Sequence, residues 1–176
     1  LCINNSEYKS NYAHYVLDFI KNTGLDGLMH DDIHFGSQYF CGCRDCRTKF
    51  RGAMGYDLPA NGQFPVDDYS NPVWRDWLRF RLISARDQVR ELRQRLPENL
   101  LFFACMSAGV LNDADVHHSG SSLEALAEGT NCMFTEGGNL YGFRNPSTDW
   151  GTDTGHRNFF ANWERLFIEK KYIGAI

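Results

Sequence analysis

The 176-residue sequence predicts an α/β fold, a partial (β/α)8 TIM barrel with parallel strands, and two features of its pattern predict it. Helical and strand-like segments alternate along the chain, and such alternation implies parallel strands joined by right-handed crossovers. The long connections follow the expected strands, at 33–70, 107–120 and 137–155, whereas the segments that lead from helices back into strands are short. A (β/α) barrel shows this asymmetry when the carboxyl ends of its strands carry the active site.

A complete barrel takes about 250 residues, so this chain would hold roughly two thirds of one. Its first residues, Leu-Cys-Ile-Asn-Asn, and its last, the apolar segment 172–176, both resemble cut strands. We therefore expect residues 1–176 to form a single domain that is an incomplete fragment of a barrel. A doubly wound open sheet is the alternative, although no Gly-x-Gly-x-x-Gly follows any expected strand.

The first expected elements are a helix and a buried strand. Asn4 stands three positions before Glu7, which is the spacing of a helix cap, and apolar residues then recur at helical spacing as far as Ile20. Gly24 supplies the stop signal for this helix. The apolar segment 25–30 then predicts a short buried strand.

The region 36–70 is an inserted loop rich in Gly, Asp, Pro and Tyr, in which a short helix is expected near 46–53. A structureless loop of this length in a compact domain needs a role of its own. Three cysteines within it supply one, because a local metal site could fold the segment.

The longest helix is expected to begin at Asn71-Pro72, a cap followed by proline at the first helical position, and to end at Pro97. The remaining expected elements are a strand at 100–106, a helix that begins with a capping box at 121–124 and ends at Gly129, a strand at 131–135, a helix at 157–171 and a strand at 172–176.

The composition excludes several classes of protein. Hydrophobic residues make up 43% of the chain, which is enough for a sizeable core. The net charge is −4 and no basic run occurs, which argues against nucleic acid as a partner. No apolar run approaches the ~18 residues of a membrane span, and no signal peptide is visible.

Three acids stand at the expected ends of strands. Asp31 and Asp32 follow the first strand, and Glu136 follows the third, directly before two glycines. Barrel enzymes hold their catalytic groups at such positions. Adjacent strand residues point to opposite faces, so only one of the two aspartates can face the site, and we choose Asp32. The alternatives are a helix cap, a turn former or a partner in a salt bridge.

Four cysteines predict a metal site. Cys41, Cys43 and Cys46 form a Cys-x-Cys-x-x-Cys motif, which lacks one ligand for a closed tetrahedral Zn²⁺ site. Cys2 is the best fourth ligand, because it would end a preceding strand on the same face of the sheet as the motif. A closed site of four thiolates would be structural rather than catalytic. Disulfides in a secreted protein, or free thiols, are the alternatives.

Five further residues are expected to contact a substrate: His30, His34, Tyr141, Arg144 and Trp150. The two histidines flank the aspartate pair, where they would donate hydrogen bonds from the wall of the site. The other three lie in the loop after the third strand, where aromatic faces could stack on a sugar ring. A catalytic metal held by the histidines with Asp32 is an alternative, as is a loop packed only by its own side chains.

Three segments of the chain resemble a known family. They read DGLMHDD, CGCRDCRTKFRGAMGYDLP and WRDWLRFRLIS, and they are similar to the barrel domain of the glycoside hydrolase family 42 β-galactosidases and their uncharacterised relatives. In that family a Cys-x-Cys-x-x-Cys followed by a Phe comes soon after the fourth barrel strand, and an earlier cysteine completes a zinc site. The resemblance covers residues 1–106 well and the remainder by element order only.

The resemblance implies that the segment 25–30 is the fourth strand and that the chain covers about strands 4 to 7 with their helices. It also implies that the four cysteines bind zinc. The family's fourth strand ends in an Asn-Glu pair whose Glu is the acid/base, whereas this chain reads Asp31-Asp32. By the same count the nucleophile would lie beyond Ile176, and Glu136 would bind substrate.

We therefore expect a glycoside hydrolase-like protein that cleaves O-glycosidic bonds of a carbohydrate by carboxylate acid/base catalysis, with structural zinc and no organic cofactor. A catalytically inactive carbohydrate-binding barrel, favoured by the missing Asn-Glu, and a metal-dependent hydrolase are the rival hypotheses. Thiols that bind zinc would fit a reducing cytoplasm, whereas disulfides would imply export. The sequence is compatible with a homo-oligomer and does not fix the oligomeric state.

Overall fold

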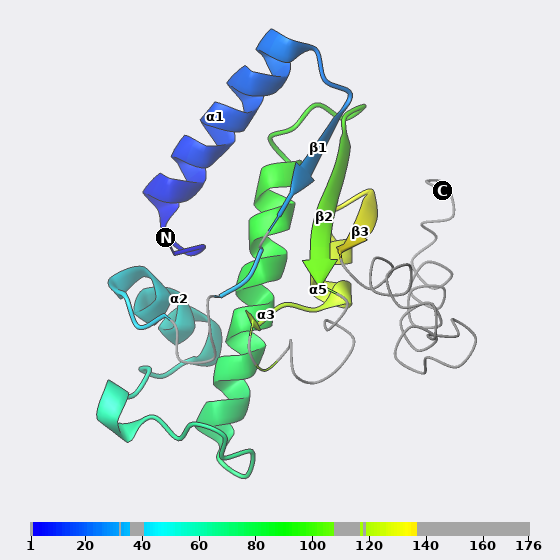
Figure 1. Cartoon of the computed structure of the whole chain (residues 1–176). Coiled ribbons are helices and arrows are strands. Elements are labelled where there is room, and N and C mark those ends of the chain that lie inside the picture. Colours follow the sequence, from blue (N-terminus) through cyan, green and yellow to red (C-terminus); the bar gives the residue numbers. More distant parts are fainter. Residues whose placement is uncertain (1, 32, 36–40, 108–116, 118, 137–176) are drawn as a thin grey trace, which may run out of the picture.

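The computed structural model describes residues 2–31, 33–35, 41–107, 117 and 119–136 (Figure 1). Within them helices alternate with three strands of one sheet. The elements are α1 (Ser6–Thr23), β1 (Gly27–His30), α2 (Arg44–Met54), a 3-10 turn η1 (Asn61–Gln63), α3 (Pro72–Arg93), β2 (Leu101–Ser107), α5 (Leu123–Ala127) and β3 (Cys132–Glu136). The helix and strand expected at 157–171 and 172–176 lie outside the described residues.

The three strands are parallel and lie in the order β1-β2-β3. The register pairs His30 of β1 with Ala104 of β2, and Ala104 with Met133 of β3. These three residues are therefore level across the sheet, and the carboxyl ends of the strands share one edge. The parallel strands joined through helices confirm the α/β arrangement that the sequence predicted.

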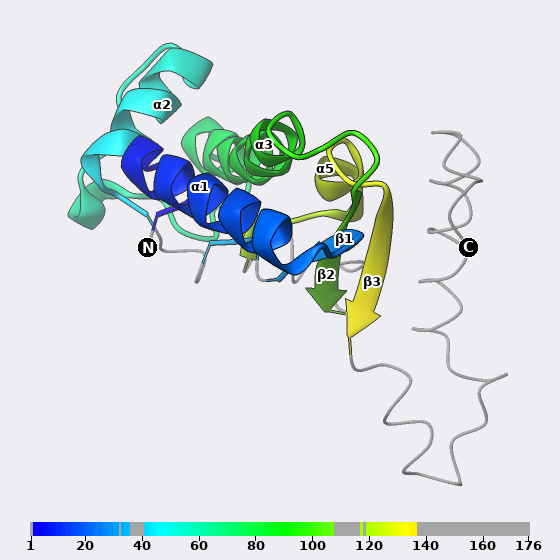
Figure 2. The same ribbon diagram turned by 90° about the horizontal axis from the view of Figure 1, so that it is seen from above.

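Helices α1, α3 and α5 lie on one side of the sheet (Figure 2). Because strand side chains alternate between faces, Phe102 and Ala104 point into the core that these helices cover. The opposite face carries Met29 and Leu101, which are 46% and 50% exposed. None of the helices in the described part of the chain is both long and apolar enough to span a membrane.

A second hydrophobic core lies between α2 and the amino-terminal half of α3. Its buried members are Phe35, Cys46, Phe50, Leu58, Trp74, Trp77 and Phe80. Aromatic rings meet edge to face within it, with the Phe50 and Phe80 centroids 5.4 Å apart. The inserted segment is therefore held by packing as well as by any metal, because it shares an aromatic core with α3.

The helix ends follow the predicted signals with shifts of up to four residues. Asn5, rather than Asn4, caps α1, because its Oδ1 accepts a hydrogen bond from the backbone of Tyr8. Ser122 is the cap of α5, one residue after the start of the predicted capping box. Helix α3 begins at the expected Pro72 but ends at Arg93, four residues before Pro97.

Candidate functional site

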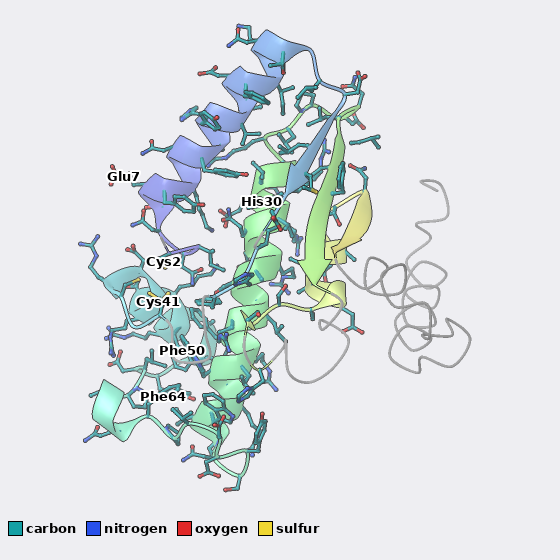
Figure 3. The ribbon with its side chains drawn as sticks, in the orientation of Figure 1. Cys2, Glu7, His30, Cys41, Phe50 and Phe64 are labelled. Carbon is teal, nitrogen blue, oxygen red and sulfur yellow. The ribbon has the colours of Figure 1, made fainter. Side chains whose placement is uncertain are left out.

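The four predicted cysteine ligands meet beside α2 (Figure 3). Cys2 lies in the turn before α1, Cys41 and Cys43 lead into α2, and Cys46 lies in its first turn. All four Sγ atoms lie within 4.8 Å of one another. The Cys2 Sγ is 3.3 Å from that of Cys46 and 3.5 Å from that of Cys43. The grouping that the sequence predicted is therefore present.

The geometry of this cluster fits a metal ion. A tetrahedral zinc with Zn–S bonds of about 2.3 Å places its sulfur atoms about 3.8 Å apart. The sulfur separations of 3.3 Å to at most 4.8 Å lie around that value. All four cysteines are free thiols and none forms a disulfide. Four sulfur donors would fill a tetrahedral site completely, so an ion held here would have no open position for a substrate.

Helix α2 helps to assemble the cluster. Cys43 is its cap residue, and the Cys43 Sγ accepts from the backbone N–H of Cys46 at 3.5 Å. Negative charge is stabilised near a helix amino terminus, so thiolates are favoured at this position. The buried Phe50 one turn later anchors the helix in the aromatic core. Asn5 also donates a hydrogen bond to Asp45 at 2.7 Å, which joins the start of α1 to the start of α2.

Asn4 has a different role from the predicted one. Its side-chain Nδ2 lies 3.3 Å from the Cys46 Sγ and 3.1 Å from the Ser84 Oγ of α3. Its backbone N–H donates to the Cys2 Sγ at 3.4 Å. The sequence predicted Asn4 as the cap at the start of α1, because Glu7 follows at the right spacing. Its contact with Cys46 spans 42 positions, so no local pattern indicates it.

The thiols perturb one another strongly. The hydrogen bond from Cys46 lowers the pKa of Cys2 to about 5, although burial acts in the opposite direction. That same hydrogen bond, together with burial, raises the pKa of Cys46 far above its ordinary value. Burial also raises the pKa of Cys41.

The candidate carboxylates lie at the carboxyl edge of the sheet. Asp31 follows β1 directly and is exposed, and Glu136 is the last residue of β3. Asp31 comes one residue after the pair of His30 with Ala104, and Glu136 pairs with Ser107, the last residue of β2. Both acids therefore lie toward the carboxyl edge of the sheet. For Glu136 the described position is that of the backbone. Asp32 lies outside the described residues, as do Tyr141, Arg144 and Trp150.

The two predicted histidines flank the end of β1. His30 is buried, its Nδ1 is 2.9 Å from the backbone oxygen of Asp31, and its ring packs on Tyr12 at 5.0 Å between centroids. His34 is half-buried, with its Nδ1 2.8 Å from the backbone oxygen of Phe35. In the described part of the chain, the group of side chains placed to hold a metal is the four cysteines. The rival site of two histidines also needs Asp32.

A buried arginine, Arg81, was missed by the sequence reasoning. It is fully buried on α3, its Nη1 donates to the backbone oxygen of His117 at 2.6 Å, and its guanidinium lies 5.3 Å from the centre of the Phe35 ring. Burial lowers its pKa to about 10. Position 81 falls four residues after Trp77 and seven after Trp74, so helical spacing could have placed it on the buried stripe.

Arg81 joins the segments that follow β1 and β2. The backbone N–H of Phe35 donates to the oxygen of Ser119 at 2.7 Å, alongside the arginine contact. His117 also lies 2.5 Å from Asp67, through Nε2 and Oδ1, and its ring packs on Trp74 with centroids 5.6 Å apart. These contacts fix the chain after two neighbouring strands, at the edge of the sheet that carries Asp31.

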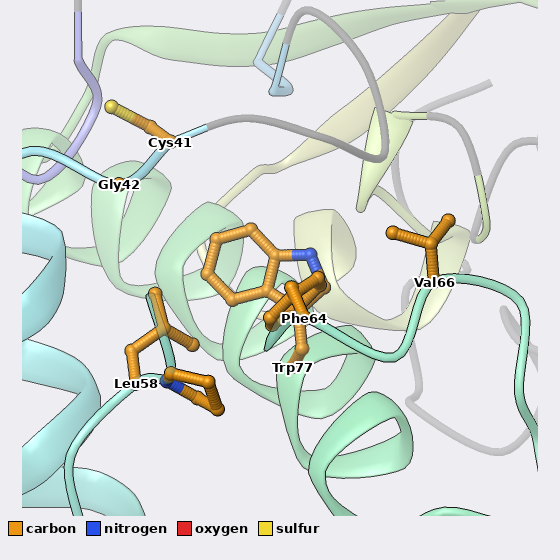
Figure 4. A pocket seen from close by; sticks show the side chains of 7 residues that line it. Cys41, Gly42, Leu58, Phe64, Val66 and Trp77 are labelled. Atoms are coloured by element: carbon orange, nitrogen blue, oxygen red, sulfur yellow. The ribbon is translucent and has the colours of Figure 1, made fainter. Parts of the chain in front are cut away.

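An apolar hollow of about 190 Å³ lies beside the cysteine cluster (Figure 4). Its lining residues are Cys41, Gly42, Leu58, Pro59, Phe64, Val66 and Trp77. No carboxylate is among these lining residues, so the hollow does not carry the acid/base chemistry that the strand ends suggest.

Comparison with known proteins gives one informative match. No family model and no curated protein matches the sequence. The glycoside hydrolase domain of PgaB (BpsB) from Bordetella bronchiseptica has a similar structure, with a TM-score of 0.70 and 16% sequence identity. The match covers 94% of this chain and 46% of the other, so the chain spans about half the length of that structure. The fold is thus like that of a glycoside hydrolase domain, whereas membership of family 42 is not supported.

Proposed function

We propose that this chain is part of a (β/α) barrel that hydrolyses O-glycosidic bonds with a pair of carboxylates. One observation carries the proposal: acids follow β1 and end β3, at the same edge of a parallel sheet in a fold that resembles a glycoside hydrolase domain. In (β/α) barrels this edge is the one that bears catalytic groups.

The exposed faces of the described elements support the barrel architecture. Met29 and Leu101 are exposed on the sheet face that the helices leave open, and in a barrel that face is the packed interior. Tyr15 and Phe19 of α1 stack on each other at 6.3 Å with 68% and 46% exposure, where the helix of a neighbouring unit would cover them. The match to 46% of the PgaB domain agrees with a barrel that extends beyond the described elements.

The proposed mechanism uses two carboxyl groups in different protonation states. Asp32, the predicted residue, or Asp31, which has the parity of the open-face residue Met29, would protonate the oxygen of the departing sugar. Glu136 would then act as the second active-site carboxylate, either on the sugar or on water. Carboxyl groups about 5 Å apart lead to retention of configuration, and a clearly larger separation leads to inversion. His34 would orient hydroxyl groups of the substrate. The ring of His30 packs on Tyr12 of α1, on the helix-covered side of the sheet, so His30 would support the strand end rather than contact the sugar.

The proposed metal is a structural zinc bound by Cys2, Cys41, Cys43 and Cys46. Such an ion supplies cross-linking rather than catalysis, because the protein fills its coordination sphere. The four thiolates would fasten the turn before α1 and the inserted segment to each other. The inserted segment follows β1, so this link would steady the strand end that carries the aspartates.

A substitution at Asp32 tests the proposed chemistry. In the complete protein, Asp32→Ala should lower kcat on the best-cleaved glycoside of an oligosaccharide panel by about 10²–10⁴-fold, because general acid catalysis is lost. Asp26→Ala is the matched control, since Asp26 is an exposed aspartate just before β1, at the opposite end of the strand. An unchanged kcat for Asp32→Ala would remove that residue from the mechanism.

A carbohydrate-binding barrel without turnover is the second candidate. It is favoured by the strand end, which reads Asp31-Asp32 where the resembling family has Asn-Glu. Calorimetric titration with the same oligosaccharides separates the two, because a binding protein takes up sugar and releases no new reducing ends.

A further inference from the structure

Asn4 is a buried polar residue to which the proposed function assigns no role. Only 9% of its surface is exposed, and its side chain reaches from the turn before α1 to both α2 and α3. The Nδ2 atom is 3.3 Å from the Cys46 Sγ and 3.1 Å from the Ser84 Oγ. It therefore links a sulfur of the cluster directly to the longest helix.

The partners of Ser84 fix the orientation of the Asn4 amide. A serine hydroxyl carries one proton, and the Ser84 Oγ donates it to the backbone oxygen of Phe80 at 2.9 Å. The Oγ can then only accept from Asn4, so the group that faces it must be the NH2 end of the amide. This NH2 group has two hydrogens, and the second one points to the sulfur of Cys46.

The other end of the amide gives Asn4 no reason to be asparagine. Among the described residues its Oδ1 is buried and has no hydrogen-bond partner. A buried carbonyl oxygen without a partner is unfavourable, and an apolar side chain of the same size would avoid that cost. Packing of the turn therefore does not account for asparagine here, whereas an N–H donor for both Cys46 and Ser84 does.

Cys46 also differs from two other cysteines in the kind of donor it has. The Cys2 sulfur accepts from the backbone N–H of Asn4, and the Cys43 sulfur accepts from the backbone N–H of Cys46. The Cys46 sulfur is the most buried of the four and takes its N–H from a side chain. A substitution at Asn4 can therefore remove the donor of Cys46, whereas the backbone donors of Cys2 and Cys43 would stay.

We propose that Asn4 is a positioning residue of the metal centre, whose amide holds the Cys46 sulfur in place and slows release of the ion. This inference rests on the proposed four-cysteine metal site. An N–H donor takes up part of the charge of a bound thiolate and fixes its direction. Loss of such an outer partner of a metal ligand commonly reduces metal affinity 10–100-fold.

The test compares metal release from the full chain in four variants. Each protein is loaded with Co²⁺ to record the thiolate-to-cobalt absorption band, and with Zn²⁺ to time its transfer to a chromophoric chelator. We expect Asn4→Leu, which has nearly the same size but no polar atoms, to release zinc at least about 10-fold faster and to shift the cobalt band. Asn4→Asp should release it faster still, because a carboxylate repels the thiolate.

Two variants serve as controls. Asn11→Leu makes the same change as Asn4→Leu at an exposed asparagine of α1, and it should keep the wild-type release rate and cobalt band. Ser84→Ala keeps the contact between Asn4 and Cys46 but removes its attachment to α3, and it should release zinc faster than wild type but more slowly than Asn4→Leu.

The outcomes distinguish the role of Asn4 from the existence of the metal site. A wild-type protein that binds neither cobalt nor zinc defeats the metal centre itself. A wild-type protein that binds both, beside an Asn4→Leu variant with unchanged release and spectrum, overturns the role of Asn4 and leaves the metal centre standing. If Asn4→Leu does not fold, the release rate of Asn4→Asp decides in the same way.

Discussion

Single residues around the inserted segment have roles that their neighbours in sequence do not suggest. Asn4 and Asn5 are chemically identical neighbours, yet Asn5 caps α1 whereas Asn4 turns to the cysteine cluster. Cys43 is both the cap of α2 and a member of that cluster. Local spacing predicted that a cap and a metal ligand would occur here. It could not predict which asparagine would contact Cys46, because that contact spans 42 positions.

Gly120 is a residue whose backbone and surroundings both require glycine. Its φ is +64°, and a Cβ at this position would lie 2.6 Å from the Cβ of Arg81 and 2.7 Å from its Nε. Gly120→Ala should therefore lower the free energy of unfolding by about 2–4 kcal/mol, from backbone strain and overpacking together. Urea denaturation followed by circular dichroism measures it.

Gly62→Ala is the control for Gly120→Ala, because nothing lies within 4 Å of a Cβ at position 62. It should change the unfolding free energy by less than about 0.5 kcal/mol. Equal stabilities of the two variants would contradict the close packing of Gly120 against the buried arginine.

At the scale of elements, α1, α3 and the strands β1 and β2 were predictable because apolar periodicity and caps mark them in the sequence. The inserted segment was less predictable. Its aromatic core joins Phe35, Phe50 and Phe80, which lie far apart in the chain, and no local pattern reports such contacts. The backbone positions of Asp31, directly after β1, and Glu136, at the end of β3, agree with the strand ends expected from the sequence.

Tyr56 provides a test of how α2 packs on α3. Its hydroxyl donates to the Asp76 Oδ2 of α3 at 3.0 Å, and its ring meets Phe50 edge to face. Burial, with this hydrogen bond, raises the pKa of Tyr56 from its ordinary value of 10.0 to about 12. Because the folded pKa lies above the unfolded one, this contribution to stability is fully present below pH 10 and is lost as the pH rises through 12.

The expected result is a tyrosine that ionises late. A spectrophotometric titration of wild type minus Tyr56→Phe should give a difference in tyrosinate absorbance with its midpoint near pH 12. A midpoint near that of a free tyrosine, about 10, would mean that Tyr56 is not held against Asp76.

On the scale of the whole molecule, α3 connects two cores. Its first half contributes Trp74, Trp77 and Phe80 to the aromatic core, and its second half contributes Val89 and Leu92 to the core under the sheet. The cysteine cluster lies against the first of these cores only. Loss of a metal should therefore affect the two halves of the molecule unequally.

Chelation of the metal tests this division. We expect hydrogen exchange after chelation to rise in the segment 41–59, where the cluster and α2 lie, because metal binding there is coupled to folding. Peptides from β2 and from the second half of α3 should keep their protection. Uniform loss of protection across the chain would contradict two separable cores, and no change anywhere would mean that the metal is not needed for the segment to fold.

The metal centre and the role of Asn4 both depend on four sulfur atoms that bind one ion. X-ray absorption at the zinc edge, on full-length protein purified without chelator, tests this most directly. We predict one zinc per chain surrounded by four sulfur atoms at about 2.3 Å. A protein without stoichiometric metal, or a zinc with nitrogen or oxygen ligands in place of sulfur, would contradict it.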